Sequence, residues 1–277
     1  MPELPEVETV RKTLAGLIVG KTVEDVQVLW PKIVKKPDDV EVFRLELIGR
    51  TVQATARRGK FLKLIFDDLV LVSHLRMEGR YLLCEQADPV DKHTHVIFKF
   101  TDGSELRYRD VRKFGTMHLF PKGTEEFSLP LNQLGPEPLG RAFTSRYLQD
   151  RLSRTKRNIK AVILDQTVVV GVGNIYADES LFRAKVHPER RADSLSAAEV
   201  KRLHRAIREI LREAVSQGGS TIRSYVNSQG DMGMFQQSLF VYARRGEPCL
   251  QCGTLIEKQV VAGRGTHYCR RCQKAGE

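Results

Sequence analysis

The chain has 277 residues, 41% of them hydrophobic, so it can bury one large core or two ordinary ones. It carries 45 Lys and Arg against 34 Asp and Glu, a formal net charge of +11, which indicates a polyanionic partner. A nucleic acid fits better than a membrane, because no apolar run approaches the ~20 residues of a spanning helix. No signal peptide opens the chain, so we expect a cytosolic protein.

The first residues, Met1-Pro2-Glu3-Leu4-Pro5-Glu6, place a proline and an acid behind the initiator methionine. Removal of that methionine leaves Pro2 as a free secondary amine, and α-amino groups titrate near ~8 against ~10.4 for lysine. Such an amine attacks a sugar aldehyde carbon to give a charged iminium, with Glu3 within reach of that carbon. A plain helix start, with Pro5 at the first helical position and apolar spacing up to Gly20, is the alternative interpretation.

Short strands are predicted for the region after this helix. The segments with β-branched or alternating apolar residues are Val23 to Trp30, Thr51 to Ala56, Phe61 to Phe66, Leu69 to Ser73, His95 to Phe100, Glu105 to Arg109 and Thr116 to Phe120. Turn signals such as Asp102-Gly103 separate them, which favours an antiparallel β-sandwich flanked by the first helix. Cys84 stands alone in an apolar stretch and is expected in the core.

The pattern becomes helical after a linker at Leu129 to Gly140, which is rich in proline and glycine. Helical segments are predicted from Ser145 to Leu164 and from Asn174 to Arg183, with a glycine-containing turn at 171–173 between them. A third helix, from Ser196 to Gly219, begins with a capping box and carries an apolar stripe. The fold class is therefore multidomain α+β.

The cysteines predict a metal site. Cys249-x2-Cys252 is followed, after 16 intervening residues, by Cys269-x2-Cys272, the spacing of a four-cysteine zinc site. Four thiolates close the tetrahedron, so one structural zinc ion is expected, and it cannot activate water. Residues 260–266 between the pairs predict a hairpin with Arg264 at its tip, where the guanidinium either meets a phosphate or is only solvated.

Four further features suit a DNA-handling surface. Lys60 lies where a turn enters a strand, where it neutralises a phosphate, shuttles a proton or is simply solvated. Basic residues in the segment 107–113 adjoin Phe114, which is either a wedge for a base stack or part of the core. The segment 151–160 has five positive charges and no acid. At 171–174, glycines open a helix whose amide groups favour a phosphate.

Three motifs together resemble one family, the bacterial formamidopyrimidine-DNA glycosylases, which repair 8-oxoguanine. They are Met1-Pro2-Glu3-Leu4-Pro5-Glu6-Val7-Glu8, Gly171-Val172-Gly173-Asn174-Ile175-Tyr176 and the four-cysteine finger, in the family's order along essentially the entire chain. The resemblance implies a catalytic β-sandwich domain over residues 1–130 and a helix-two-turns-helix domain over 131–235. It further implies a loop at 217–235 that closes over the extruded base, and a zinc finger over 239–273.

The resemblance also implies the reaction and its residues. Pro2 attacks C1′ of the damaged nucleotide, Glu3 donates a proton, and two eliminations then nick the strand. Lys60 matches the proton donor of the first elimination and Arg264 that of the second; either can instead hold phosphate, because arginine is a very poor acid. The family's other DNA contacts match His93, Arg112, Lys156 and Asn174, and its inserted trio matches Met77, Arg112 and Phe114.

The expected partner is therefore damaged double-stranded DNA, bound by a monomer in the bacterial cytoplasm and associated with the nucleoid. Two other functions stay open. An endonuclease VIII-type enzyme of the same superfamily prefers oxidised pyrimidines, but Leu4 and the segment Arg112 to Phe114 favour the purine enzyme. The other is a non-catalytic, zinc-dependent DNA-binding protein, in which the presence of Pro2 and Glu3 at the start of the chain would be accidental.

Overall fold

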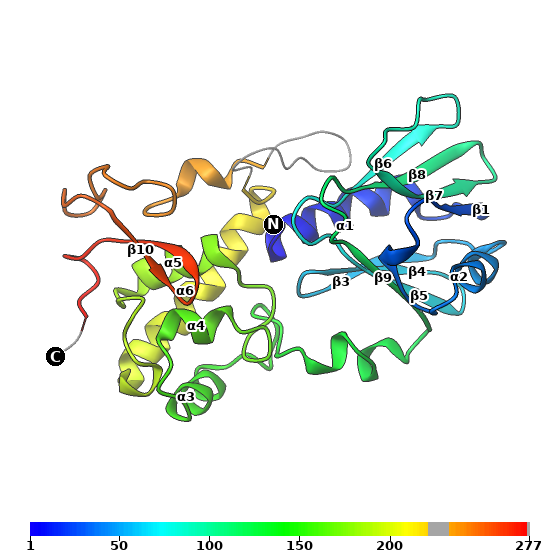
Figure 1. The fold of residues 1–277 in the computed structure, drawn as a ribbon. Coiled ribbons are helices and arrows are strands. Elements are labelled where there is room, and N and C mark those ends of the chain that lie inside the picture. The colour runs from blue at the N-terminus through cyan, green and yellow to red at the C-terminus, as the bar shows by residue number, and fades with distance from the viewer. Residues whose placement is uncertain (221–232, 276–277) are drawn as a thin grey trace. The chain divides into compact units, whose positions relative to one another are not determined.

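The computed structural model describes residues 1–220 and 233–275, and the chain divides into two compact units (Figure 1). The first unit comprises Met1–Asn132 with the described residues 218–220 and 233. The second comprises Gln133–Gln217 and the described residues from Met234 onward. In the described part of the chain, no helix is both long and apolar enough to cross a membrane.

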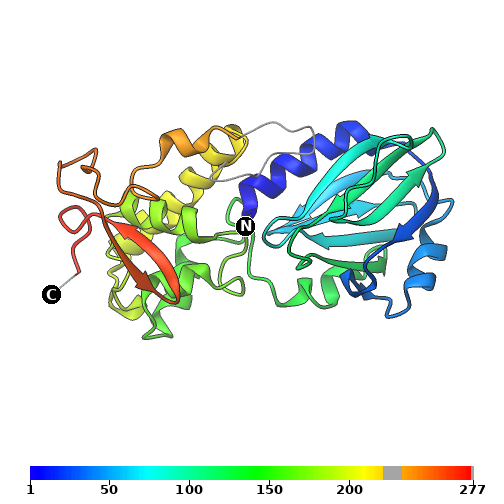
Figure 2. The same cartoon turned by 45° about the horizontal axis from the view of Figure 1, so that its top comes forward.

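The first unit is a β-sandwich with helices beside it (Figure 2). One antiparallel sheet has the strand order β1-β7-β8-β6, with β1 at Val23–Val28, β6 at Arg80–Glu85, β7 at Thr94–Phe100 and β8 at Ser104–Arg109. The other has the order β2-β9-β5-β4-β3, with β2 at Val34–Lys36, β3 at Ala54–Arg58, β4 at Phe61–Ile65, β5 at Leu69–His74 and β9 at Thr116–Pro121. Only β2 breaks the antiparallel pattern, because it pairs in parallel with β9.

The sandwich agrees with the sequence prediction in its seven expected strands but contains two more. β2 has three residues, too few for an alternating pattern, and β6 lacks both β-branched residues and strict alternation. Cys84 lies on β6 and is half-buried, so its placement in the core was wrong.

Two helices, α1 (Leu4–Ile18) and α2 (Val40–Leu47), complete the first unit. The predicted apolar face of α1 contributes Val7, Val10, Leu14 and Ile18 to one core shared with both sheets. Full burial of each such side chain stabilises the fold by roughly 1.5–3 kcal/mol, so α1 is firmly attached to the sandwich. The residues just before α1 are held in place as a result.

The second unit is built on four helices: α3 (Ser145–Ser153), α4 (Ile159–Leu164), α5 (Asn174–Ala184) and α6 (Ala197–Ser216). The single helical segment predicted for 145–164 was wrong, because the chain turns between α3 and α4. There the side chain of Asn158 accepts a hydrogen bond from Ala161 N at 2.7 Å and starts a new helix. The capping box and the buried stripe predicted for α6 are confirmed.

The C-terminal part forms the expected hairpin from β10 (Glu257–Val261) and β11 (Arg264–Tyr268). Its two turn residues, Ala262 and Gly263, have φ values of 52° and 68°, as a tight two-residue hairpin turn requires. Short 3-10 segments lie at Pro31–Ile33, Glu125–Phe127, Leu131–Gln133, Ala192–Ser194 and Phe235–Ser238.

Candidate active site and nucleic-acid interface

The start of the chain is buried against the first unit. Pro2 and Glu3 are both buried directly before α1. Glu6, in the first turn of α1, accepts hydrogen bonds from Glu3 N at 2.8 Å and from Ser220 N at 2.7 Å. At Gly219, φ is +81° and a Cβ would lie 2.6 Å from Glu6 Oε1, so this position requires glycine. One carboxylate therefore joins the N-terminus to the segment that follows α6.

Lys60 lies in the tight turn between β3 and β4 and is only 6% exposed. Arg57 fixes this turn, because its guanidinium donates to Gly59 O at 2.9 Å and pairs with Glu8 of α1 at 3.2 Å. The lysine is thus held on the first unit together with the helix that carries the N-terminus. Because the Lys60 side chain is largely buried, it loses little further rotamer freedom when it binds a ligand.

The loop between β8 and β9 is organised around one buried carboxylate. Asp110, 1% exposed, accepts from the backbone N–H groups of Arg112 at 3.0 Å, Phe114 at 2.8 Å and Gly115 at 2.9 Å. Phe114 is 49% exposed, which excludes the core alternative, and the Arg112 guanidinium lies 4.6 Å from its ring centroid. The loop therefore presents an aromatic ring and a cation outward.

The turn after β5 packs close to the loop between β8 and β9. Met77 is 39% exposed at the turn after β5. A Cβ at Gly79, in that turn, would lie 2.2 Å from Tyr108 Oη, and a Cβ at Gly115 would lie 1.8 Å from the same atom. Both glycines are needed for close packing around one hydroxyl. The geometry thus brings together the turns that carry Met77 and Phe114, while the insertion of these side chains into DNA stays a prediction.

In the second unit, Asn174 begins α5 and donates through Nδ2 to Gly265 O of β11 at 2.9 Å. The α5 N-terminus carries the partial positive charge of a helix end, which favours a phosphate. Lys156 is exposed in the turn between α3 and α4, and Arg264 is exposed at the start of β11. These three residues therefore all belong to the second unit.

A buried ion pair fixes the hairpin to the helices. Lys160 of α4 is fully buried, and its Nζ donates to Asp178 Oδ1 of α5 at 2.6 Å and to Thr266 Oγ1 at 2.7 Å. Asp178 Oδ2 accepts from His267 N at 2.8 Å. The placement of Lys160 on a DNA-facing surface was therefore wrong, because its charge is satisfied inside the protein.

Arg107 was also wrongly assigned to that surface. It is 3% exposed, its Nε donates to Glu105 at 2.7 Å, and its terminal nitrogens donate to backbone carbonyls of the segment 85–89. The basic runs contain structural as well as exposed cations, and sequence alone does not separate them.

The four cysteines converge on one point. The ligand sulfurs lie within 4.8 Å of one another, with Sγ–Sγ distances of 3.9 Å for Cys249 and Cys272 and 3.5 Å for Cys252 and Cys269. A tetrahedral zinc with Zn–S bonds of ~2.3 Å separates its sulfurs by about 3.8 Å, so the set fits zinc. Gln273 joins this site to the segment just after α5, since its Oε1 accepts from Cys269 N at 2.9 Å and its Nε2 donates to Val186 O at 3.0 Å.

Cys249→Ala is expected to release the zinc and to weaken binding of an 8-oxoguanine duplex about tenfold. The free energy of zinc binding stabilises the folded finger, and the finger presents Arg264. Zinc content per chain and duplex affinity measure the effect. Cys84→Ala, which removes the cysteine outside the finger, is the matched control and should keep the full zinc content. Undiminished duplex affinity of the zinc-free protein would contradict the proposed role of the finger.

His74, at the end of β5, is a buried base beside cations. Burial, and then the charges of Arg76 and Lys60, lower its pKa to about 3, while its Nδ1 accepts from Arg76 N at 2.9 Å. The unfolded chain binds the proton near pH 6.5, so between pH 6.5 and 3 the unfolded state holds more protons than the folded one. The contribution of His74 to protein stability therefore falls as the pH drops below 6.5.

Because asparagine does not titrate, the variant His74→Asn is expected to lose about 1–2 kcal/mol less stability than the wild type when the pH falls from 7 to 5. Asparagine keeps an acceptor for Arg76 N, so the hydrogen bond survives. Denaturant unfolding of both proteins at the two pH values measures this difference. Equal losses in both proteins would show that another group is responsible.

Comparison with known proteins agrees with this geometry. Three family models match in order: the formamidopyrimidine-DNA glycosylase N-terminal domain at residues 1–117, the formamidopyrimidine-DNA glycosylase H2TH domain at 134–226, and the zinc finger found in FPG and IleRS at 246–275. A protein from Bacillus licheniformis named formamidopyrimidine-DNA glycosylase is 61% identical over 274 residues, covering 99% of this chain and 100% of its own. The chain belongs to the formamidopyrimidine-DNA glycosylase family.

Other members of the family agree in sequence and in fold. The glycosylase of Geobacillus kaustophilus is also 61% identical over 274 residues, 99% of this chain and 100% of its own. The solved complex of Lactococcus lactis Fpg with DNA containing an abasic site has a TM-score of 0.92 at 43% identity, and the match covers 98% of this chain and 99% of that one. The one structural zinc and the α+β architecture expected from the sequence are thereby confirmed.

Several residues that shape the site were not predicted. Glu6 was named only as part of the N-terminal motif, and Asp110 and Asp178 were not singled out. An acid inside an arginine-rich segment is a usable signal for Asp110, because such a carboxylate often organises a turn. The interpretation of 217–235 as a base-capping loop falls mainly on residues 221–232, outside the described residues.

Proposed function

We propose that this protein removes oxidised purines, namely 8-oxoguanine and formamidopyrimidines, from double-stranded DNA and then nicks the strand by β,δ-elimination. The observation that carries the proposal is full-length membership of the family together with Pro2 and Glu3 held at the buried start of α1. Solved Lactococcus lactis Fpg structures include complexes with DNA that contains Fapy-dG or an abasic site, which supports the same substrate class here.

Pro2 is the nucleophile in this proposal, once Met1 has been removed. Its nitrogen forms a bond to C1′ as the bond from C1′ to the base breaks, and the proton released from that nitrogen leaves with the base. Opening of the sugar ring then gives an iminium between the proline nitrogen and C1′, and Glu3 donates a proton in this step. The positive nitrogen withdraws electrons and makes the C2′ hydrogens acidic.

The two eliminations follow from that acidity. Loss of a C2′ proton expels the 3′ phosphate, and a second elimination expels the 5′ phosphate. Lys60 serves the first elimination as proton donor, and Arg264 serves the second mainly by binding the departing phosphate. Water finally hydrolyses the iminium and regenerates the free amine.

Access to C1′ requires the damaged nucleotide to leave the helix, at a cost of a few kcal/mol in lost stacking and pairing. Phe114 enters the stack as a wedge, Met77 fills the gap, and Arg112 pairs with the orphaned base. The exposure of Phe114 and the shared packing around Tyr108 support this assignment. Phosphates are held by His93, Lys156 and Asn174.

The proposed domains are the catalytic sandwich over 1–130, the helix-two-turns-helix domain over 131–235 and the finger over 239–273. In this arrangement the protein binds DNA as a monomer, and DNA binding associates it with the nucleoid. Neutralised phosphates release counterions, so we expect affinity to fall steeply with salt.

Turnover of an 8-oxoguanine duplex against a thymine glycol duplex tests the substrate class. The oxidised-pyrimidine alternative needs this test, because Lactococcus lactis Fpg has also been solved in complex with DNA that contains an oxidised pyrimidine. We expect faster release of 8-oxoguanine. Preference for the pyrimidine lesion would move the protein to the endonuclease VIII type, and tight binding without base release would leave a DNA-binding protein only.

A further inference from the structure

The outer face of α6 carries a depression that no step of the proposed reaction uses. This α6 groove has a volume of about 550 Å³ and reaches the start of α3 at Ser145. One acidic residue, Glu209, lines it. Its basic lining residues are Lys201, Arg202, Arg205, Arg208 and Arg212.

The positive charge of the groove is not balanced locally. The other two carboxylates of α6 bind arginines from elsewhere in the unit: Glu213 pairs with Arg183 at 2.6 Å, and Glu199 pairs with Arg190. Glu209 is 3.9 Å from Arg205, at the limit of an ion pair.

Within residues 1–220 and 233–275, the remaining four cations of the groove have no carboxylate at ion-pairing distance. Arg208 donates instead to the carbonyls of Pro138 and Gly140 at 2.8 and 2.9 Å, which fixes its guanidinium in the wall. An unbalanced, partly rigid set of cations is a site for an anionic ligand.

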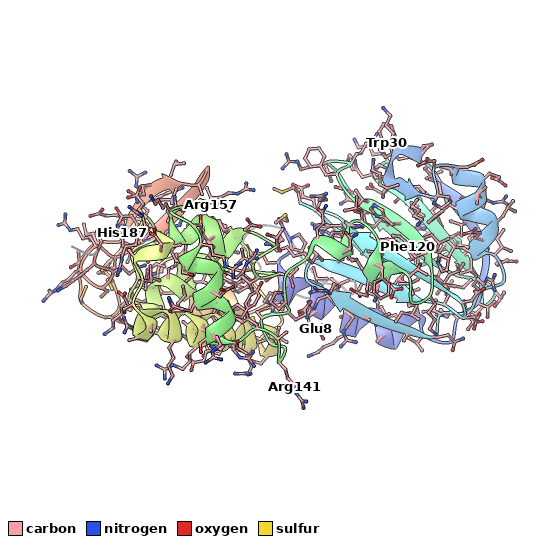
Figure 3. All side chains as sticks on the ribbon, turned by 90° about the horizontal axis from the view of Figure 1, so that it is seen from below. Glu8, Trp30, Phe120, Arg141, Arg157 and His187 are labelled. Atoms are coloured by element: carbon pink, nitrogen blue, oxygen red, sulfur yellow. The ribbon has the colours of Figure 1, made fainter. Side chains whose placement is uncertain are left out.

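The groove also lies away from the turn between α3 and α4, which carries Lys156. Figure 3 shows Arg157, in the turn between α3 and α4, on the upper side of the unit, whereas α6 runs along its lower side. The opposite face of α6 is buried through its apolar stripe, so only the basic face is available to a partner.

The spacing of the cations matches an extended peptide. Lys201, Arg205, Arg208 and Arg212 follow one stripe of α6, where four residues advance by about 6 Å. Two residues of an extended chain advance by about 6.6 Å. Carboxylates at alternate positions of a segment of about six residues therefore meet successive basic side chains, and arginine binds each carboxylate bidentately.

Glu209 favours a peptide over a nucleic acid. A carboxylate in the middle of the groove repels phosphates, and a sugar-phosphate backbone of DNA has no hydrogen-bond donor to offer it. A peptide backbone offers N–H groups, and the methylene stems of lysine and arginine accept its apolar side chains. We propose that the α6 groove binds an extended acidic segment of a partner protein, independently of the repair reaction.

Fluorescence polarisation with the full chain tests this proposal. The probe is a labelled six-residue peptide with aspartate at alternate positions and alanine elsewhere; the control peptide has asparagine in place of aspartate. The double variant Arg205→Ala/Arg212→Ala removes two cations of the groove. The matched variant Arg245→Ala/Arg270→Ala removes two exposed cations elsewhere on the same unit.

We expect the aspartate peptide to bind at least about tenfold more tightly than the asparagine peptide, and the groove variant to lose that difference. The matched variant should keep it, and the groove variant should bind an 8-oxoguanine duplex as the wild type does. Equal binding of both peptides, or equal losses in both variants, would overturn the proposal. A groove variant that loses duplex affinity instead would identify a nucleic-acid surface and also overturn it.

Discussion

Replacement of Pro2 by glycine is expected to reduce borohydride trapping on an 8-oxoguanine duplex by about 100-fold, which corresponds to ~2.7 kcal/mol of transition-state stabilisation. Glycine permits removal of Met1 and leaves a primary amine, so a little trapping should persist. Because α1 begins at Leu4 and Glu6 still accepts from the backbone of Glu3, the helix start survives the change. Affinity for the duplex should therefore stay within about threefold of the wild type.

Pro5→Ala is the matched control for this variant. Pro5 also lies at the start of α1, but it has no free amine at any stage, so trapping by Pro5→Ala should resemble that of the wild type. Full strand nicking by Pro2→Gly would remove Pro2 from the mechanism. Loss of duplex affinity together with trapping would indicate a folding defect, which the unfolding transition of the same sample identifies.

Lys160→Met is expected to destabilise the second unit by about 3–5 kcal/mol, since it leaves the Asp178 carboxylate buried without its ammonium partner. The contact between α4 and Thr266 is lost as well, so the hairpin that presents Arg264 loosens and duplex binding weakens. Denaturant unfolding and duplex titration of the same variant measure both effects.

The double variant Lys160→Met/Asp178→Leu separates charge from packing. It removes both buried charges, so it should be more stable than Lys160→Met alone although it leaves His267 N without its acceptor. If the free energy of unfolding of Lys160→Met lay within about 1 kcal/mol of the wild-type value, the buried pair would not be important for stability.

Much of the fold follows from local sequence patterns. The stripe and capping box of α6 and the glycine-containing hairpin turn all depend on neighbouring residues, and the structure contains each of them. The helical segment 145–164 was predicted wrongly, because its apolar spacing continues through a turn that Asn158 caps. Strand β2 depends on pairing with β9, distant in the chain, and so leaves no local signal.

The candidate site divides in the same way. The four cysteines belong to a motif with a chemical reason for its spacing, so sequence identifies them, whereas the catalytic roles of Pro2 and Glu3 stay predictions. Glu6 acts on Ser220 across 214 positions, and Lys160 acts on Thr266 across 106. Such contacts depend on the folded chain, and a lysine in a basic run is indistinguishable by sequence from one that binds DNA.

Borohydride trapping of the wild-type protein on a duplex with a single 8-oxoguanine, followed by peptide mapping of the crosslink, tests whether Pro2 is the nucleophile. We expect one crosslink, at the nitrogen of Pro2 in a chain that lacks Met1. A crosslink at Lys60 or another lysine, or tight binding of the duplex without any crosslink, would contradict it.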